Sequence, residues 1–164
     1  MPRLSFDDPL PLGMASEAEH MRIRVSTRFS CDQVVQGINT HLPQGLRITG
    51  CRLKSEIHED GVGFSTQVQK YRIEFSGLEF NTALLDQFQA CSQWPYLRPR
   101  QKRADQPIDL KAAVKKIECR NLSQIYMEID TQTQFTVRPA DFLVGVLQLT
   151  PIQLQQVVIT KLAG

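Results

Sequence analysis

The amino-acid sequence predicts an α+β protein, on three observations. Apolar residues make up 41% of the 164 residues and charged residues 22%, which is typical of a chain that folds around a core. Segments that alternate apolar and polar side chains, as strands do, are interspersed with segments of helical periodicity. Prolines, glycines and capping residues punctuate the boundaries between them.

Residues 1–60 contain a strand–helix–strand pattern after a short opening strand at 2–6. Residues 19–26 alternate cleanly and predict a half-buried strand. Ser30 opens a helix, with Gln33 in capping-box position, and the helix ends at Pro43-Gln44-Gly45. Apolar residues at 46, 48 and 53 predict a further strand.

Residues 61–100 begin with a long strand, which we expect over 64–76. Its alternation slips phase between Val68 and Tyr71, as a β-bulge would cause. Asn81 is placed to cap the helix that follows, and an extended segment is expected over 96–102.

The last third is expected to hold a short amphipathic helix at 108–117 and a hairpin pairing 124–130 with 135–137. Pro139 starts a helix over 140–147. A strand over 157–162 follows it.

This order predicts two tandem ferredoxin-like halves, each a split βαβ arrangement with its helices on one face of a sheet. The first half, residues 1–60, lacks its opening strand and helix; residues 61–164 form the second. We expect the two halves to make one compact unit.

The positive charge is concentrated in one stretch, although the net charge is only +2. Residues 95–120 carry eight basic and three acidic side chains, a balance of +5. The four cysteines lack the spacing of a zinc or iron–sulfur site, so we expect small core hydrophobes, no metal and no cofactor. No stretch is apolar for the ~20 residues of a membrane span, and a cytoplasmic location is the default expectation.

The basic run after Trp94 is the strongest local signal of function. On an extended segment Arg98, Arg100 and Lys102 would point to one side, at roughly the spacing of phosphates along a nucleic-acid strand. Arg103 would add a further contact, and Tyr96 or Trp94 could stack on bases. The alternative is a solvated edge strand whose charges deter aggregation.

A second candidate site lies beside the proline-rich connection, where Ser16, Glu17 and Glu19 accompany Arg3. The two glutamates could act as an acid/base pair, but they lack a nucleophile or metal ligand. The favoured interpretation is that the Glu17 carboxylate accepts hydrogen bonds from backbone N–H groups of the loop.

Two single residues also need weighing. Asp109 is expected to cap a helix starting at Leu110; by fold analogy alone, it could be the lone catalytic aspartate of a pseudouridine synthase. Arg138, just before Pro139, could bind an anion, although a structural ion pair is commoner.

Several motifs resemble a bacterial family of radical-SAM-linked proteins (domain of unknown function 2344). The segments are Pro2-Arg3-Leu4-Ser5-Phe6, Pro9-Leu10-Pro11-Leu12-Gly13, Ser16-Glu17-Ala18-Glu19, Leu42-Pro43-Gln44-Gly45-Leu46, Tyr71-Arg72-Ile73, Ile108-Asp109-Leu110 and Arg138-Pro139. The chain departs from the family at His20, where Tyr is commoner, and at Lys161, where Arg is frequent. It also starts after the family's opening strand and helix, which carry a Ser-His-Leu-Asp motif.

The resemblance implies a companion of B12-binding radical SAM proteins, either fused to them or encoded separately. The chain has no Cys-x-x-x-Cys-x-x-Cys motif, so a radical SAM cluster would belong to the partner. We therefore expect a module that is more a binder than an enzyme and that presents RNA to this partner. The alternatives are a protein-docking subunit, which could form a homodimer, and an RNA-modifying enzyme acting through Asp109.

Overall fold

The computed structural model describes residues 3–6, 10, 13–17, 19–25, 29–53, 67–77, 79–100 and 104–163, with the backbone alone at 3–6. The chain divides into two compact units, considered separately below. The first comprises residues 1–7 and 20–65, and the second residues 8–19 and 66–164.

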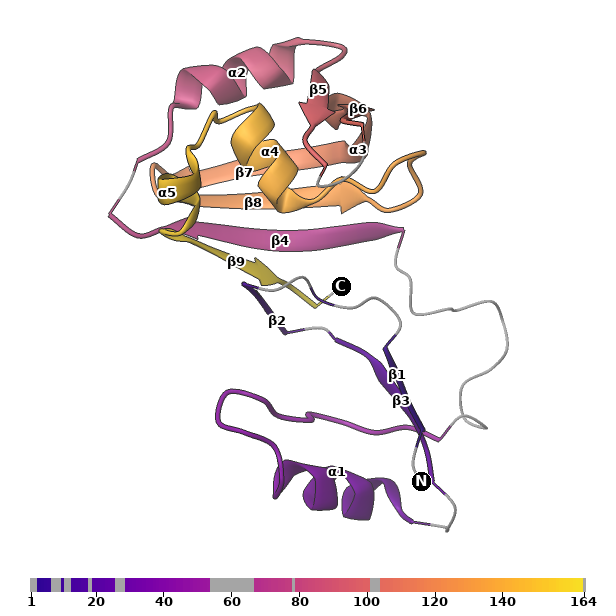
Figure 1. Cartoon of the computed structure of the whole chain (residues 1–164). Helices are drawn as coiled ribbons and strands as arrows, with labels where there is room; N and C mark the ends of the chain where they lie inside the picture. The colour runs from indigo at the N-terminus through magenta and orange to yellow at the C-terminus, as the bar shows by residue number, and fades with distance from the viewer. Residues whose placement is uncertain are drawn as a thin grey trace. The chain divides into compact units, whose positions relative to one another are not determined.

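The described residues of the first unit include a two-stranded ribbon and one helix (Figure 1). Strand β1 (Arg3–Phe6) pairs antiparallel with β3 (Met21–Arg24), so that Arg3 lies opposite Arg24 in the register. Helix α1 (Cys31–Asn39) begins at Ser30, whose hydroxyl accepts from the Gln33 backbone while the Gln33 side chain accepts from the Ser30 N–H. The predicted capping box is confirmed.

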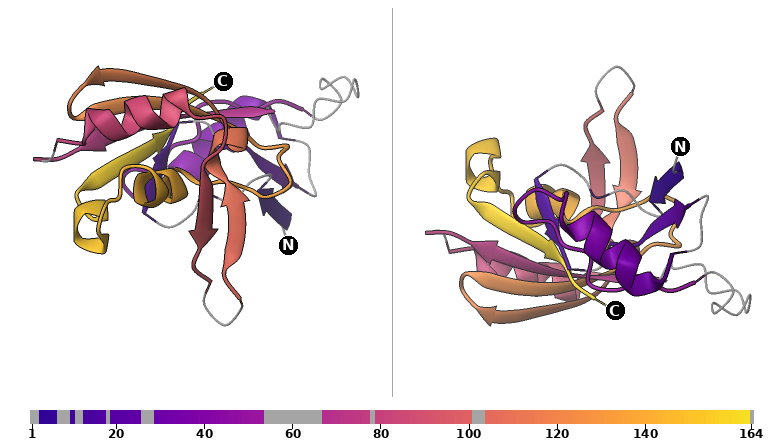
Figure 2. Two further views of the ribbon diagram at one scale, coloured as in Figure 1. Left: turned by 90° about the horizontal axis from the view of Figure 1, so that it is seen from above. Right: turned by 90° about the horizontal axis from the view of Figure 1, so that it is seen from below.

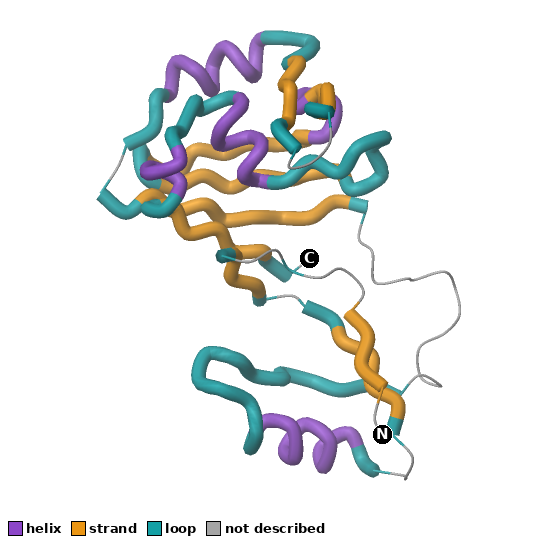
Figure 3. The backbone as a smooth tube through the Cα atoms, in the orientation of Figure 1, coloured by secondary structure: helices purple, strands orange, loops and turns teal. Residues whose placement is uncertain are grey.

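The chain then turns and runs back past α1 as an extended segment over 46–53 (Figure 3). Asn39 fixes this segment, because its amide donates to the Ile48 carbonyl at 3.0 Å and accepts from the Ile48 N–H at 2.8 Å. The expected strand is wrong in one respect, since no described residue pairs with 46–53 as a neighbouring strand.

The second unit is built on a five-stranded mixed sheet (Figure 1). Its strands are β2 (Met14–Ser16), β4 (Val68–Phe75), β7 (Val114–Asn121), β8 (Gln124–Asp130) and β9 (Val157–Lys161). The strand order is β2-β9-β4-β8-β7, antiparallel throughout except for the parallel β2–β9 pair. The β4–β8 register is continuous, so the predicted bulge in β4 is wrong.

The helices of this unit lie on one face of the sheet (Figures 1 and 3). They are α2 (Thr82–Ala90), α3 (Leu110–Ala113), α4 (Pro139–Gly145) and α5 (Pro151–Leu154). Alternate residues of the central strands pack against these helices, so that Ile73 and Ile125 of the sheet and Phe142 of α4 are fully buried. Asn81 caps α2 through its side chain, and Pro139 occupies the first turn of α4, both as predicted.

Two predictions for the last third are wrong. The expected helix over 108–117 is only the four residues of α3, and the chain continues directly as β7. Strand β8 forms no hairpin with 135–137; it lies between β7 and β4, which satisfy both of its edges. Pairing across the sheet offers more buried hydrogen bonds than either local alternative.

The fold class is therefore α+β, as predicted. Strand β2 adds a further strand to the sheet of the second unit. The sequence predicted only an extended connection there. Among the described residues no helix has both the length and the apolar composition needed to cross a membrane.

Candidate nucleic-acid interface

Arg98 and Arg100 of the basic run lie on a two-stranded arm between α2 and α3. Strand β5 (Pro95–Arg98) pairs antiparallel with β6 (Gln106–Asp109), with Arg98 opposite Gln106. The hairpin projects from the body of the second unit (Figure 2). At its tip Arg100 is exposed, and its backbone N–H donates to the Asp105 carboxylate at 3.2 Å.

The base of the arm is anchored by Trp94. Its indole Nε1 donates to the Gly145 carbonyl on α4 at 2.9 Å, and its backbone N–H donates to Asp109 Oδ1 at 2.9 Å. Its carbonyl accepts from Leu110 N–H at 3.0 Å. These bonds tie both ends of the hairpin to the helical layer.

Gly145 permits this approach because it has no side chain. A Cβ atom there would come within 2.8 Å of Tyr96 Cδ2 and of Leu110 Cδ1, closer than such atoms pack. The arm therefore rests directly on the backbone of α4.

A partly desolvated ion pair completes the anchor. Arg98 Nε donates to Asp141 Oδ1 at 2.9 Å, its Nη2 pairs with Asp141 Oδ2, and the same Nη2 donates to the Thr136 carbonyl at 2.6 Å. The side chains of Arg98 and Asp141 are only 15% and 10% exposed. Such bidentate pairing uses the guanidinium within the protein.

The aromatic rings of the arm also make contacts within the protein. Trp94 packs edge-on against Phe88, with ring centroids 5.5 Å apart. Tyr96 is half-buried against α4, and this burial raises the pKa of its phenol. Both residues are partly buried, which reduces the ring surface left for stacking with bases.

The structure thus separates the predicted nucleic-acid residues into two groups. Arg98, Tyr96 and Trp94 belong to the base of the arm, and Arg100 is at the tip. Lys102 and Arg103 lie outside the described residues. The sequence could not reveal this division, because the partner of Arg98 is 43 residues away.

The predicted loop site forms an ion-pair cluster on β2 and its neighbours. Ser16 donates to Glu19 at 2.9 Å, and Glu19 pairs with Lys161 on β9 at 3.2 Å. Glu17 lies 3.5 Å from Arg72 on β4. These contacts attach the connecting segment to the sheet, whereas Arg3 belongs to β1 of the first unit.

Asp109 and Arg138 occupy helix starts. Asp109 Oδ1 accepts the N–H groups of Lys111, at 3.0 Å, and of Trp94, so the predicted cap is confirmed. The Arg138 N–H donates to Asp141 at 2.7 Å, while its own side chain is exposed.

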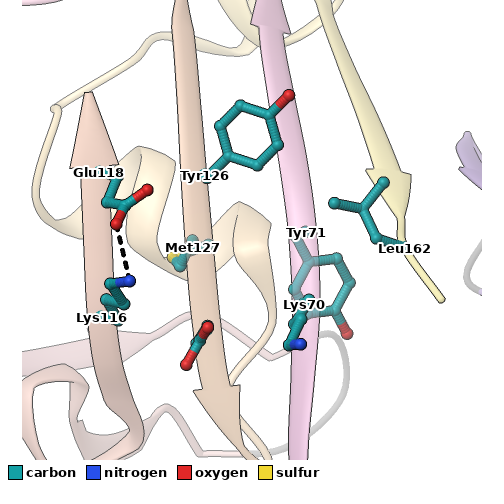
Figure 4. A pocket seen from close by; sticks show the side chains of 8 residues that line it. Lys70, Tyr71, Lys116, Glu118, Tyr126, Met127 and Leu162 are labelled. Carbon is teal, nitrogen blue, oxygen red and sulfur yellow. Dashed lines mark ion pairs between the residues drawn. The ribbon is translucent and has the colours of Figure 1, made fainter. Parts of the chain in front are cut away.

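A shallow depression on the sheet face opposite the helices was not predicted (Figure 4). Lys116 and Glu118 on β7 pair there at 2.6 Å, which raises the pKa of the lysine and lowers that of the glutamate. Arg120 lies 5.4 Å from the Tyr126 ring centroid. The depression therefore contains both positive and negative side chains. The alternating pattern of β7 could have indicated it, but the start of this segment was expected to be helical.

The described residues contain no group of three or more metal-binding side chains. None of the four cysteines forms a disulfide in the described structure; Cys119 is exposed and the others are partly buried. The expectation of core cysteines is therefore wrong for Cys119. Burial nevertheless raises the pKa of its thiol, with a smaller contribution from Asp86.

Comparison with known proteins finds no matching curated protein and no matching solved structure. A family model described as "Uncharacterized protein conserved in bacteria (DUF2344)" matches residues 1–139, which is most of the chain. The chain belongs to this family of uncharacterised proteins conserved in bacteria.

Proposed function

We propose that the protein is a non-catalytic RNA-binding module that acts beside a B12-binding radical SAM protein. The observation that carries the RNA proposal is the arm, which projects from the second unit and is attached through a dedicated set of internal bonds (Figure 2). These bonds hold Trp94 and Arg98, and so the base of the hairpin, against the helical layer. Preorganisation of this kind lowers the entropic cost of binding.

Arg100, at the described end of the arm, supplies a phosphate contact, while Arg98 positions the arm through Asp141. Lys102 and Arg103, which follow Arg100 in the sequence, supply further phosphate contacts. The exposed Leu97, on β5, replaces the aromatic rings as the apolar surface next to the bases. Binding would then depend on charge more than on stacking, and would be strongly salt-dependent.

The architecture proposed for this function keeps two related halves. The β4-α2-β7-β8-α4-β9 order, with sheet order β9-β4-β8-β7, supports a ferredoxin-like second half with the arm as its insertion. The first unit would be a partial half of the same kind. The radical SAM partner follows from the family resemblance in the motifs, and its cluster would be held by that partner.

The RNA-modifying alternative would need a reactive Asp109. One of its carboxylate oxygens already accepts two backbone N–H groups, which favours a structural role. A docking role without RNA is the remaining alternative, and the partly exposed apolar residues of the first unit favour it as an additional function.

The test is fluorescence anisotropy with a labelled tRNA pool at several salt concentrations. We expect the wild-type affinity to fall steeply with salt, and the Arg100→Glu/Lys102→Glu variant to lose at least about tenfold in affinity, with a shallower salt dependence. The matched control is Lys70→Glu/Arg120→Glu, which makes the same change in net charge at exposed positions of the sheet. Equal losses in both variants, or no binding by the wild type at low salt, would contradict the proposal.

A further inference from the structure

The extended segment at 47–52 of the first unit has the form of a strand without a neighbour. It runs back past α1 after the turn at Gly45 (Figures 1 and 3). It contains no proline, and Ile48 and Thr49 are β-branched residues that favour strands. Most of its residues are exposed.

The contact with Asn39 defines the two edges of this segment. Both the N–H and the carbonyl of Ile48 are taken by the Asn39 side chain. In a strand the N–H and C=O of one residue point to the same edge, and those of the next residue point to the other. The backbone groups of Arg47, Thr49 and Cys51 therefore face away from the Asn39 contact.

That outer edge is open. Within the part of the chain that the structure describes, the backbone groups of Arg47, Thr49 and Cys51 form no hydrogen bond. An open row of donors and acceptors of this kind is a template for a strand from another chain.

The charge of the unit indicates which chain it accepts. The first unit, residues 1–7 and 20–65, carries seven basic and five acidic side chains, a balance of 7 − 5 = +2. Its part over 20–53 carries five arginines and one acidic residue, Asp32, a balance of 5 − 1 = +4. Among the described residues, Arg24, Arg47 and Arg52 form no ion pair. A second copy would bring two units of the same positive charge together, so the charge disfavours self-association.

Apolar side chains flank the open edge. Leu46 is 63% exposed and Leu53 is 49% exposed, one at each end of the segment. A partner with apolar residues near its ends would cover them.

We propose that the 47–52 edge binds an extended acidic segment of a partner protein by β-strand addition. Main-chain bonds to Arg47, Thr49 and Cys51 supply the pairing, and acidic side chains of the partner neutralise Arg47 and Arg52. This docking site uses residues of the first unit alone and is independent of the RNA contact at the arm.

The probes are three labelled octapeptides: one alternating Glu and Val, one alternating Lys and Val, and the Glu–Val peptide with alternate backbone nitrogens methylated. Anisotropy with the full chain should show binding of the first and at least about tenfold weaker binding of the other two, because the lysines repel the arginines and methylation removes main-chain donors. Backbone NMR shifts should concentrate at 47–52. No binding of the acidic peptide would overturn the proposal, and the arginines would then only deter aggregation.

Variants of the chain locate the edge. Thr49→Pro removes an outward N–H and should weaken the acidic peptide about tenfold, whereas Thr49→Val keeps the N–H and should bind as the wild type does. Arg47→Glu/Arg52→Glu should reverse the preference toward the lysine peptide. Strand addition would be refuted if the methylated peptide bound the wild type as tightly as the unmethylated peptide does, or if Thr49→Pro bound the acidic peptide as tightly as the wild type does. The methylated peptide remains a valid test even if the proline variant unfolds. RNA binding by the arm is expected to stay unchanged in all these variants.

Discussion

The two compact units differ in how their structure is held. In the first, no described residue is fully buried, and Phe29 and Leu46 are 50% and 63% exposed. In the second, a single core joins the sheet to the helices, with Phe88 and Phe142 at its centre. Both units contain capped helices and paired strands, so local structure alone does not account for the difference.

Burial of apolar area is the dominant stabilising contribution in a domain. The first unit depends instead on local polar contacts, namely the Ser30 capping box and the Asn39–Ile48 pair. Such bonds contribute about 1 kcal/mol each, which is little against the entropy of ordering a small unit. The second unit therefore has the larger stabilisation from its own core.

The largest expected effect is in the core of the second unit. Phe142→Ala removes a fully buried ring that packs edge-on against Phe88 at 5.3 Å, and should lower the free energy of unfolding by about 3–5 kcal/mol. Ile38→Ala, on the half-buried face of α1, should cost only about 1 kcal/mol. Urea denaturation followed by the fluorescence of Trp94, the one tryptophan of the chain, reports on the second unit.

Ile38→Ala should leave that fluorescence transition in place and reduce only the helical signal in circular dichroism. If Ile38→Ala shifted the Trp94 fluorescence transition as well as the circular dichroism signal, the two units would unfold together. That result would contradict the proposed difference in their stability.

The next effect concerns the arm. Arg98→Met keeps the aliphatic stem but leaves Asp141 with its charge largely desolvated and unpaired, at a cost of about 3 kcal/mol. Arg100→Met, two residues further on and exposed, should change the free energy of unfolding by no more than about 0.5 kcal/mol. The same Trp94 fluorescence transition measures both. Equal effects would show that Arg98 is as free as Arg100.

This arginine pair also shows what could be predicted from the sequence. The caps at Ser30 and Asn81 and the helix start at Pro139 are predicted correctly, because a helix start is set by residues within one turn of it. The role of Arg98 is not, because it depends on Asp141, which only the folded chain brings near.

The error over 108–117 has the same origin. Leu110, Ala113, Val114 and Ile117 recur at helical spacing, so the local pattern predicts a helix. The chain leaves the helix after Ala113, because 114–121 pairs antiparallel with β8, with register shifts at 114–116 and at 119–121. Tertiary pairing overrides local periodicity where the partner strand is already held by β4.

Two glycine-to-alanine substitutions, one in each unit, should change stability in opposite directions. Gly145→Ala places a Cβ 2.8 Å from Tyr96 and Leu110, and should destabilise the second unit by about 1–3 kcal/mol and loosen the arm. Gly37→Ala in α1 meets nothing within 4 Å, and should stabilise that helix by about 0.5–1 kcal/mol. Thermal unfolding measures the first and far-UV circular dichroism the second. Destabilisation by Gly37→Ala would indicate that α1 is covered in solution.

The smallest expected effect is a pH dependence confined to the second unit. The Gln132 backbone N–H donates to Asp130 at 2.8 Å and Lys115 lies 3.2 Å away, and together they lower the pKa of Asp130. Because the pKa is lower in the folded than in the unfolded state, this carboxylate stabilises folding above its unfolded pKa of about 4. The stabilisation is lost as the pH falls toward the depressed folded value.

Asp130→Asn should therefore flatten the acid side of the stability profile measured by Trp94 fluorescence. It should not abolish the slope, because Lys116 also lowers the pKa of Glu118 in the same sheet. Lys115→Met, which leaves the Gln132 bond intact, should give an intermediate slope. If Asp130→Asn left the profile unchanged, the carboxylate would have the same pKa in the folded and the unfolded chain. The contacts with Gln132 and Lys115 at the end of β8 would then not stabilise the folded state.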